Sequence, residues 1–202
     1  MLAKATPLWF FSLFIFLFIF LFISFFYQIF YSLFFLTLIL LLFFTIFFRD
    51  PEREIGDGIV SPADGKIIEL KEENDKLMLC IFMNLHNVHV NRSPIDCEVK
   101  KITYYKGKHL PAFFRGAEKN ERIETIFETD IGEMKIIQIG GIFARKVISY
   151  ITEGMKIKKG DRIGMIRFGS RVELILPLGK VKILVKKGEK VIAGATKIGE
   201  LI

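Results

Sequence analysis

The sequence predicts a mainly β protein, in which a compact β-sandwich or barrel-sandwich-like soluble domain follows an N-terminal transmembrane helical hairpin. Two observations lead to this fold class. No charged residue lies between Lys4 and Arg49, and 16 of the 22 Phe residues fall in that stretch. The rest of the chain consists of short segments rich in β-branched and aromatic residues. These segments are separated by residues typical of turns. We therefore expect a membrane anchor at residues 1–48 and a soluble domain at residues 49–202.

The anchor is too long for one straight membrane span. The apolar run Leu8–Phe48 has 41 residues, and as one helix it would be about 60 Å long, roughly twice the hydrocarbon thickness of a bilayer. A polar cluster at residues 24–32 divides the run into Leu8–Phe25 and Leu33–Phe48, each just long enough to cross. The alternative is a re-entrant anchor that never crosses. We do not expect a cleavable signal peptide, because the apolar run is too long for one.

Basic residues flank both helices of the expected hairpin. Lys4 precedes the first helix, and Arg49 and Arg53 follow the second. Because positive residues favour the cytoplasmic side, both ends of the hairpin are expected there. This predicts a protein of the cell membrane whose soluble domain faces the cytoplasm.

The soluble domain reads as a series of strands punctuated by turn dipeptides such as Asn74-Asp75. One short helix is expected near Pro111–Lys119. The strands are predicted at Lys66–Leu70, Leu77–Met83, Glu98–Tyr105, Ile123–Phe127, Lys135–Ile139, Lys146–Ile151, Arg162–Arg167, Val172–Leu176 and Val181–Val185.

An imperfect repeat also favours a β architecture. The segment Lys158–Ile163 recurs 28 residues later as Lys186–Val191. A basic-Gly-acidic turn before a short strand is typical of hairpins, and it resembles the turns of lipoyl- and biotinyl-type barrel sandwiches.

The charge distribution narrows the range of partners. All but one of the 29 Lys and Arg, and all 22 Asp and Glu, lie in the soluble domain. A moderate basic excess beside a membrane favours anionic lipid headgroups, although a solvated Lys- and Glu-rich surface explains it equally well. We expect no nucleic-acid partner, because the chain has no dense basic helix and no aromatic-basic platform. Cys80 and Cys97 are expected to be reduced thiols.

The most informative segment is the octapeptide from Arg167 to Leu174, which contains Gly169-Ser170. A serine hydroxyl can attack the carbonyl of the preceding glycine and convert the amide to an ester. Elimination then breaks the chain, and the new N-terminus becomes a pyruvoyl group, which can replace pyridoxal phosphate in amine decarboxylation. A Gly-Ser pair by itself is usually only a turn. Here it stands between two predicted strands, where backbone strain can persist.

The octapeptide resembles the processing site of the phosphatidylserine decarboxylases, in the short form found in many bacteria and archaea. Further segments carry the resemblance in the right order over roughly residues 47–202. They are Phe47–Arg53, Ser61–Gly65, Asn87–Pro94, Asn120–Arg122 and Ala144-Arg145.

The resemblance implies a proenzyme that cuts itself between Gly169 and Ser170. The products would be a β chain, residues 1–169, and an α chain, residues 170–202, held together as a heterodimer alone or within a higher oligomer. Ser170 would become the covalent pyruvoyl cofactor. By the same resemblance His89 deprotonates Ser170 and later handles the substrate's proton, and Asp64 orients His89.

The implied reaction is decarboxylation of a serine phospholipid, phosphatidylserine, to phosphatidylethanolamine. One alternative is archaetidylserine, an ether lipid that would undergo the same chemistry. The other alternative is a non-enzymatic, membrane-tethered barrel-sandwich adaptor, which would leave the octapeptide unexplained.

Several residues are candidates for contacts with the substrate. The resemblance suggests His86 and Arg92, and Arg115, Arg122 and Arg145 are further candidates for a phosphate or carboxylate. The longer family forms have an acidic residue and a Tyr just before the first histidine, where this chain has Asn84-Leu85, so their headgroup contacts do not transfer.

His86 and His89 have the spacing H-x-x-H, which on a helix would suggest a metal site. The context is strand-like, and on a strand these positions point to opposite faces. We therefore expect no metal.

Overall fold

The computed structural model describes residues 1–108, 110, 116, 119–141, 146–167 and 170–202. The chain forms two units, Met1–Pro51 and Glu52–Ile202, and each is described by itself. The helix expected near Pro111–Lys119 falls mostly outside the described residues.

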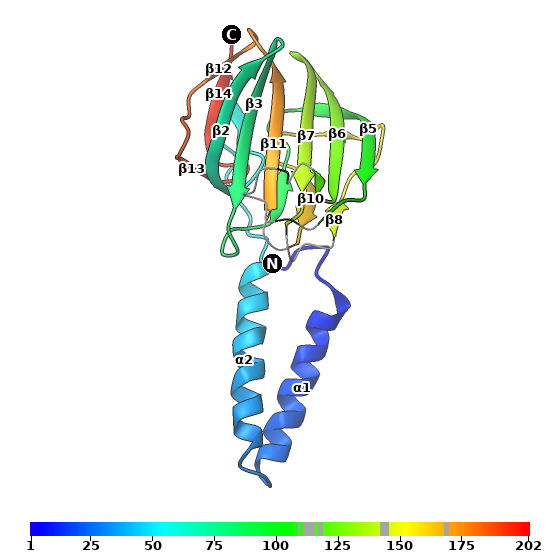
Figure 1. Ribbon diagram of the computed structural model, residues 1–202, viewed down its shortest axis with the longest axis vertical. Helices are drawn as coiled ribbons and strands as arrows, with labels where there is room; N and C mark the ends of the chain where they lie inside the picture. Colours follow the sequence, from blue (N-terminus) through cyan, green and yellow to red (C-terminus); the bar gives the residue numbers. More distant parts are fainter. Residues whose placement is uncertain (109, 111–115, 117–118, 142–145, 168–169) are drawn as a thin grey trace. The chain divides into compact units, whose positions relative to one another are not determined.

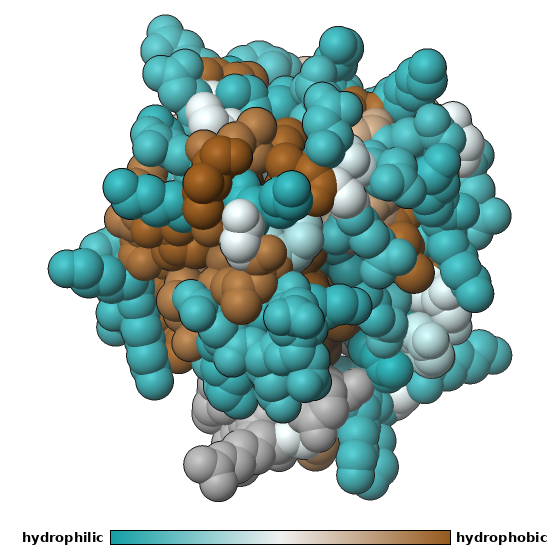
Figure 2. Space-filling model, turned by 90° about the horizontal axis from the view of Figure 1, so that it is seen from above, coloured by the Kyte–Doolittle hydropathy of each residue, from teal (hydrophilic) through white to brown (hydrophobic). Residues whose placement is uncertain are grey.

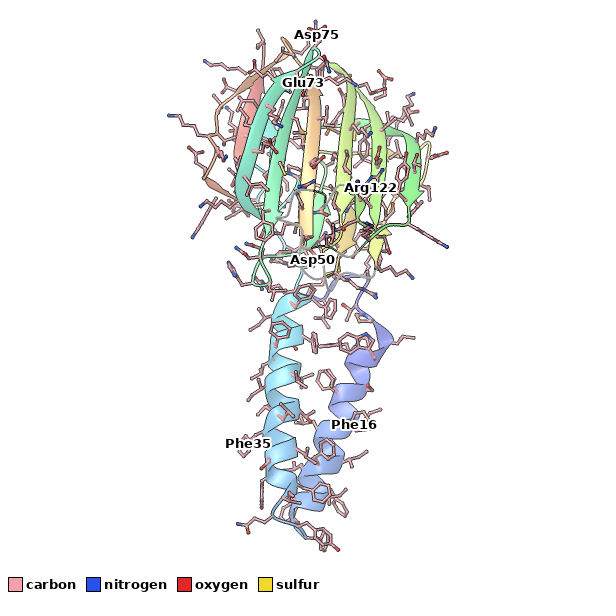
Figure 3. All side chains as sticks on the ribbon, in the orientation of Figure 1. Phe16, Phe35, Asp50, Glu73, Asp75 and Arg122 are labelled. Carbon is pink, nitrogen blue, oxygen red and sulfur yellow. The ribbon has the colours of Figure 1, made fainter. Side chains whose placement is uncertain are left out.

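The first unit is a helical hairpin of α1 (Leu8–Ser24) and α2 (Phe30–Phe47). Aromatic side chains line both helices, with Phe16 on α1 and Phe35 on α2 (Figure 3). Trp9 of α1 packs edge-to-face on Phe44 of α2, with ring centroids 4.8 Å apart. The hydroxyls of Ser12, Ser24, Thr37 and Thr45 each bond to a backbone carbonyl of their own helix, as Thr37 does to the carbonyl of Leu33 at 2.8 Å. These four groups therefore add little energetic cost in an apolar surrounding.

The length and composition of α2 are those of a membrane-spanning helix. It has 18 residues without a charge, which corresponds to about 27 Å of helix against a hydrocarbon layer of about 30 Å. The apolar helix α1 is slightly shorter, with 17 residues. The prediction of an apolar N-terminal hairpin is confirmed.

The second unit is mainly β, as predicted, and a large curled sheet dominates it (Figure 1). Its neighbouring strands pair antiparallel. In spatial order the strands are β13 (Lys190–Val191), β2 (Gly65–Glu73), β3 (Lys76–Met83), β11 (Ser170–Pro177), β7 (Gly132–Ile139), β6 (Arg122–Thr129), β5 (Cys97–Tyr105) and β9 (Lys156–Ile157).

Two three-stranded sheets complete this unit. One has the order β1 (Ile59–Val60), β14 (Lys197–Leu201), β12 (Val181–Ile183), and the other has the order β4 (Val90–Arg92), β10 (Arg162–Ile166), β8 (Val147–Ser149). One hydrophobic core joins the three sheets, since it contains Ile198 and Val181 of the first, Ile163 and Val147 of the second, and Leu174 of the large sheet. On the face shown in Figure 2 the surface is mostly hydrophilic, and an apolar area lies among the polar side chains.

The predicted strands overlap observed ones, because short β-branched or aromatic segments bounded by turn residues mark them in the sequence. The strand β11 alternates buried and half-buried residues along its whole length. The turn at Asn74-Asp75 joins β2 to β3, and both residues have positive φ, 50° and 58°, as a tight two-residue hairpin turn requires.

The repeat at Lys158–Ile163 and Lys186–Val191 does form two similar turns, in which Gly160 and Gly188 have φ of 86° and 98°. The expectation that these turns close hairpins is wrong. The strand β9 before the first turn pairs with β5, whereas β10 after it pairs with β4 and β8. A positive φ at glycine lets the chain reverse sharply, and here the reversal carries it from one sheet to another.

Candidate functional site

Ser170 is the first residue of β11, an internal strand of the large sheet. Ser170 is opposite Met83 of β3, and the next residue, Arg171, is opposite Ile139 of β7. The side chain of Ser170 is fully buried. Its hydroxyl donates to the sulfur of Met83 at 3.3 Å. The strand therefore fixes the backbone on the C-terminal side of the Gly169-Ser170 bond, while Gly169 lies outside the described residues.

The chain changes sheets immediately before Ser170. The strand β10 ends at Ile166 in the small sheet with β4 and β8, and β11 begins at Ser170 between β3 and β7. Only residues 167–169 connect the two strands. A short connection held by a sheet at each end restricts the backbone conformations open to the Gly-Ser bond.

His89 directly precedes β4 and is completely buried. Its carbonyl accepts a hydrogen bond from the N–H of Ile166 at 3.2 Å, which joins it to the last residue of β10. The ring Nδ1 lies 2.9 Å from the carbonyl of Asn87. Because a carbonyl only accepts, this contact places a hydrogen on Nδ1 and leaves Nε2 as the basic nitrogen of the neutral ring.

Asp64 stands in the turn before β2, and hydrogen bonds hold both oxygens of its carboxylate. The guanidinium of Arg53 bonds to Oδ1 at 2.5 Å and to Oδ2 at 2.9 Å. The backbone N–H groups of Ala193 and Val88 donate to Oδ1 at 2.9 Å and to Oδ2 at 3.3 Å. Asp64 therefore reaches the segment of His89 through the backbone of the neighbouring residue.

Steric crowding explains why a glycine, Gly65, follows Asp64. A Cβ at Gly65 would lie 2.1 Å from the carbonyl oxygen of Phe82. This close approach of β2 to β3 explains why a Gly closes the Ser61–Gly65 segment.

A buried polar group near Ser170 was not predicted from the sequence. The side-chain amide of Asn91 on β4 approaches the sulfur of Met83 at 3.7 Å, and the amide of Gln138 on β7 donates to the Asn91 oxygen at 2.8 Å. Both amides are at most 2% exposed. The hydroxyl of Ser170 and the amide of Asn91 thus converge on one sulfur. Asn91 lies two residues after His89. Because side chains alternate between the two faces of an extended segment, residues two apart lie on the same face.

The two suggested substrate contacts occupy different surroundings. His86 is exposed in the loop between β3 and β4. Arg92 is only 4% exposed, and its guanidinium donates to the carbonyl of Gly160 at 2.9 Å. This hydrogen bond attaches the turn at residues 158–161 to β4, so Arg92 has a structural role.

Among the other arginines, Arg122 bonds to Glu124 at 2.9 Å and its guanidinium lies over the ring of Tyr105 at 4.0 Å. It lies on β6 (Figure 3). Arg115 and Arg145 lie outside the described residues.

Both cysteines are free and buried. Burial raises the pKa of the Cys80 thiol to about 12, and burial also raises the pKa of Cys97. Neither thiol therefore ionises near neutral pH. Within the described part of the chain, no three His, Cys, Asp or Glu side chains gather as metal ligands would.

Comparison with known proteins gives one family. The model of the family described as phosphatidylserine decarboxylase matches residues 40–199. This stretch includes the Ser61–Gly65 turn, the His89 segment and the octapeptide around Ser170.

Several curated relatives have nearly equal similarity. A protein of Methanosarcina barkeri named putative archaetidylserine decarboxylase proenzyme is 46% identical over 156 residues, which are 76% of this chain and 74% of that one. A phosphatidylserine decarboxylase proenzyme of Streptomyces avermitilis is 46% identical over 152 residues, 74% of this chain and 70% of that one. A putative archaetidylserine decarboxylase proenzyme of Archaeoglobus fulgidus is 46% identical over 150 residues, 73% of each chain. The chain therefore belongs to the phosphatidylserine decarboxylase family.

Proposed function

We propose that this protein is a membrane-associated proenzyme that cuts itself between Gly169 and Ser170 and then decarboxylates a serine phospholipid. The single observation that carries the proposal is the placement of Ser170. It is buried at the start of an internal strand, four residues beyond the strand end that hydrogen bonds to His89. The family and the proenzyme names of its relatives support the same reaction class. The adaptor alternative gives no reason for this arrangement.

Cleavage begins with the hydroxyl of Ser170. Its oxygen attacks the carbonyl carbon of Gly169 and forms an ester as the bond to the Ser170 nitrogen breaks. The hydroxyl proton passes to a base, and the freed amine takes up a proton. Nε2 of His89 suits the role of base, because the Asn87 carbonyl engages the other ring nitrogen.

The second stage eliminates the ester. The Cα proton of Ser170 leaves, the bond between Oγ and Cβ breaks, and residue 169 departs as a carboxylate. Addition of water and loss of ammonia convert the remaining dehydroalanine to a pyruvoyl group at the start of β11.

The location of Ser170 fits such a group. Ser170 is fully buried, so residue 170 is shielded from water, and β3 and β7 fix the strand behind it. The pyruvoyl group supplies the electron-withdrawing carbonyl that amine decarboxylation needs. The residues around it would then hold the substrate and move its proton, and His89 is the candidate for the proton.

The fold also explains how the protein would survive its own cleavage. The α chain, residues 170–202, contains β11, β12, β13 and β14. Of these strands, β11 pairs with β3 and β7, β13 with β2, and β14 with β1 of the β chain, while β12 pairs with β14. The two chains are therefore expected to stay together as one heterodimer.

The lipid backbone of the substrate follows less directly from the residues. The relatives carry names for both diacyl and archaeal ether lipids, and the reacting serine headgroup is the same in both. We propose phosphatidylserine as the substrate, with archaetidylserine as the alternative that undergoes identical chemistry. An apolar hairpin suits either, because a two-tailed lipid stays in the bilayer and the enzyme must come to it.

We further propose that both helices cross the membrane and that both ends face the cytoplasm. The flanking residues Lys4, Arg49 and Arg53 support this orientation. A re-entrant hairpin remains the alternative arrangement.

The intact mass of the purified protein tests the processing step. We expect two chains divided at Gly169-Ser170, with an α chain that has no free α-amine, and one uncut chain for Ser170→Ala. Active protein with a single full-length mass would refute the pyruvoyl mechanism. His89→Ala should slow or block the cut because Ser170 then lacks its base. If this variant both cleaves and turns over normally, His89 is only structural.

Activity is tested on vesicles that contain either phosphatidylserine or archaetidylserine, with release of carbon dioxide as the readout. Turnover of one lipid but not the other identifies the substrate. Turnover of neither by correctly cleaved protein would contradict the proposed reaction while leaving the cleavage intact.

A further inference from the structure

Arg53 is a residue to which sequence reasoning gave only a role in membrane orientation, yet its side chain is buried against Asp64. The side chains of Arg53 and Asp64 are 11% and 10% exposed. The two terminal nitrogens of the guanidinium donate to the two carboxylate oxygens at 2.5 and 2.9 Å. A bidentate pair of this kind has a defined geometry that a lysine cannot reproduce.

The same pair holds both backbone groups of Ala193. The guanidinium of Arg53 donates to the Ala193 carbonyl at 2.8 Å, and the Ala193 N–H donates to Asp64 at 2.9 Å. The residues next to these continue the contact, because Gly194 N–H donates to the Ser61 carbonyl at 2.8 Å. Ala193 belongs to the α chain that cleavage would create, whereas Arg53 and Asp64 belong to the β chain.

Asp64 also holds the segment that carries His89. The Val88 N–H donates to its second oxygen at 3.3 Å, and His89 is the next residue. In total Asp64 accepts hydrogen bonds from two guanidinium nitrogens and two backbone nitrogens. Four donors fill the acceptor sites of a carboxylate.

We propose that Arg53, Asp64, Val88 and Ala193 form a clasp that keeps the His89 segment and the α chain in register with each other. This inference rests on the proposed self-cleavage. In the clasp Arg53 is a positioning residue, since it orients the Asp64 carboxylate. Asp64 acts on His89 through the backbone of Val88, and the Arg53 guanidinium balances its charge.

The clasp and a direct charge relay give opposite expectations for Arg53. If the Asp64 carboxylate served the imidazole of His89 directly, removal of the competing guanidinium would leave cleavage unchanged or accelerate it. If the carboxylate holds the backbone, removal of Arg53 lets Asp64 turn away, and both the His89 segment and Ala193 lose their anchor.

The experiment compares Arg53→Gln and Arg53→Lys with the matched changes Arg162→Gln and Arg162→Lys. Arg162 is a suitable control because its guanidinium pairs at 2.8 Å with Glu52, whose side chain is 74% exposed. Cleavage of the full chain is followed over time in detergent micelles. In the uncut Ser170→Ala background, hydrogen exchange is measured at the amides of Val88 and Ala193.

We expect Arg53→Gln to slow cleavage by about tenfold or more, the scale of one charge-assisted hydrogen bond. Exchange at Val88 and Ala193 should become faster, and the Arg162 variants should resemble the wild type in both measurements. Arg53→Lys keeps the positive charge but cannot form the bidentate pair with Asp64. It should therefore slow cleavage nearly as much as Arg53→Gln does. This milder variant decides the question if Arg53→Gln fails to fold. In protein that has been cleaved, kcat should fall while KM for vesicle lipid stays within about twofold, because Arg53 holds backbone and not lipid.

Folded Arg53 variants that cleave at the wild-type rate or faster would overturn the clasp, as would unchanged exchange at Val88 and Ala193. The outcome is separable from the proposed function. If the wild-type chain never cleaves, the proposed function fails, and hydrogen exchange in the uncut protein still decides whether the clasp exists.

Discussion

The proposed cleavage between Gly169 and Ser170 would have a thermodynamic signature that a simple dilution series can detect. Unfolding of a protein made of two chains releases two molecules, so its stability depends on concentration. Each tenfold dilution should lower the unfolding free energy by about 1.4 kcal/mol. The uncut Ser170→Ala protein unfolds as one chain, and its α-chain segment should show no such dependence.

A core substitution in the α chain tests how the two chains are held. Leu174 in the middle of β11 is fully buried, opposite Leu79 of β3 and Ile136 of β7. Loss of a buried leucine side chain typically costs about 2–5 kcal/mol. Leu174→Ala should therefore raise the dissociation constant of the two chains by about 30-fold to several thousand-fold. Leu184→Ala is the matched control, because Leu184 is 43% exposed and should cost only about 1 kcal/mol.

The assay is urea unfolding of the detergent-solubilised protein at several concentrations, followed by circular dichroism, with size-exclusion chromatography to detect the free α chain. A midpoint independent of concentration in cleaved protein would refute the two-chain description. Equal effects of Leu174→Ala and Leu184→Ala would show that β11 is not the strand that holds the chains together.

Three further predictions follow from buried groups and from the hairpin. Met83→Leu keeps the volume but removes the sulfur that holds the Ser170 hydroxyl, so cleavage should be about 2- to 10-fold faster; a slower rate in a time course would mean that the sulfur orients the hydroxyl productively. The pKa of Cys80 is raised to about 12, so its contribution to stability is complete below about pH 9 and is lost as the pH rises toward 12, at up to about 1.4 kcal/mol per unit. Urea unfolding at pH 8 and pH 10.5 should show a smaller loss for Cys80→Ala than for the wild type, and equal losses would contradict this assignment. Single cysteines placed at Lys4 and at the exposed Lys66, in a background without native cysteines, should react with a membrane-impermeant reagent only from the cytoplasmic side, and labelling from opposite sides would exclude the hairpin topology.

The sequence was a good guide to features that depend on local composition. The strands β2, β3 and β11 were located because they are short segments rich in β-branched and other apolar residues between turn residues, and the apolar hairpin was located because its composition is so extreme. The short loop that joins the two helices was also visible, since its polar residues interrupt the apolar run.

Features that depend on distant pairing were not visible. The turn before β10 looked like a hairpin because its local sequence fits one, but the partners of β9 and β10 lie in different sheets. In the same way, the contacts between Arg53 and Asp64 and between Asn91 and Gln138 join segments that no local pattern connects. The side chains predicted for the site were chosen by resemblance to a family, because no local pattern brings Asp64, His89 and Ser170 together.

The pairing of β11 has a consequence for the order of events during biosynthesis. The partners of β11, β13 and β14 are all made earlier, and one of them, β1, begins as early as Ile59. The large sheet cannot be completed before β13 has been made, and the sheet of β1, β14 and β12 cannot be completed before β14 has been made. If cleavage needs both sheets to hold residue 170, then a chain truncated or stalled before Leu201 cannot mature.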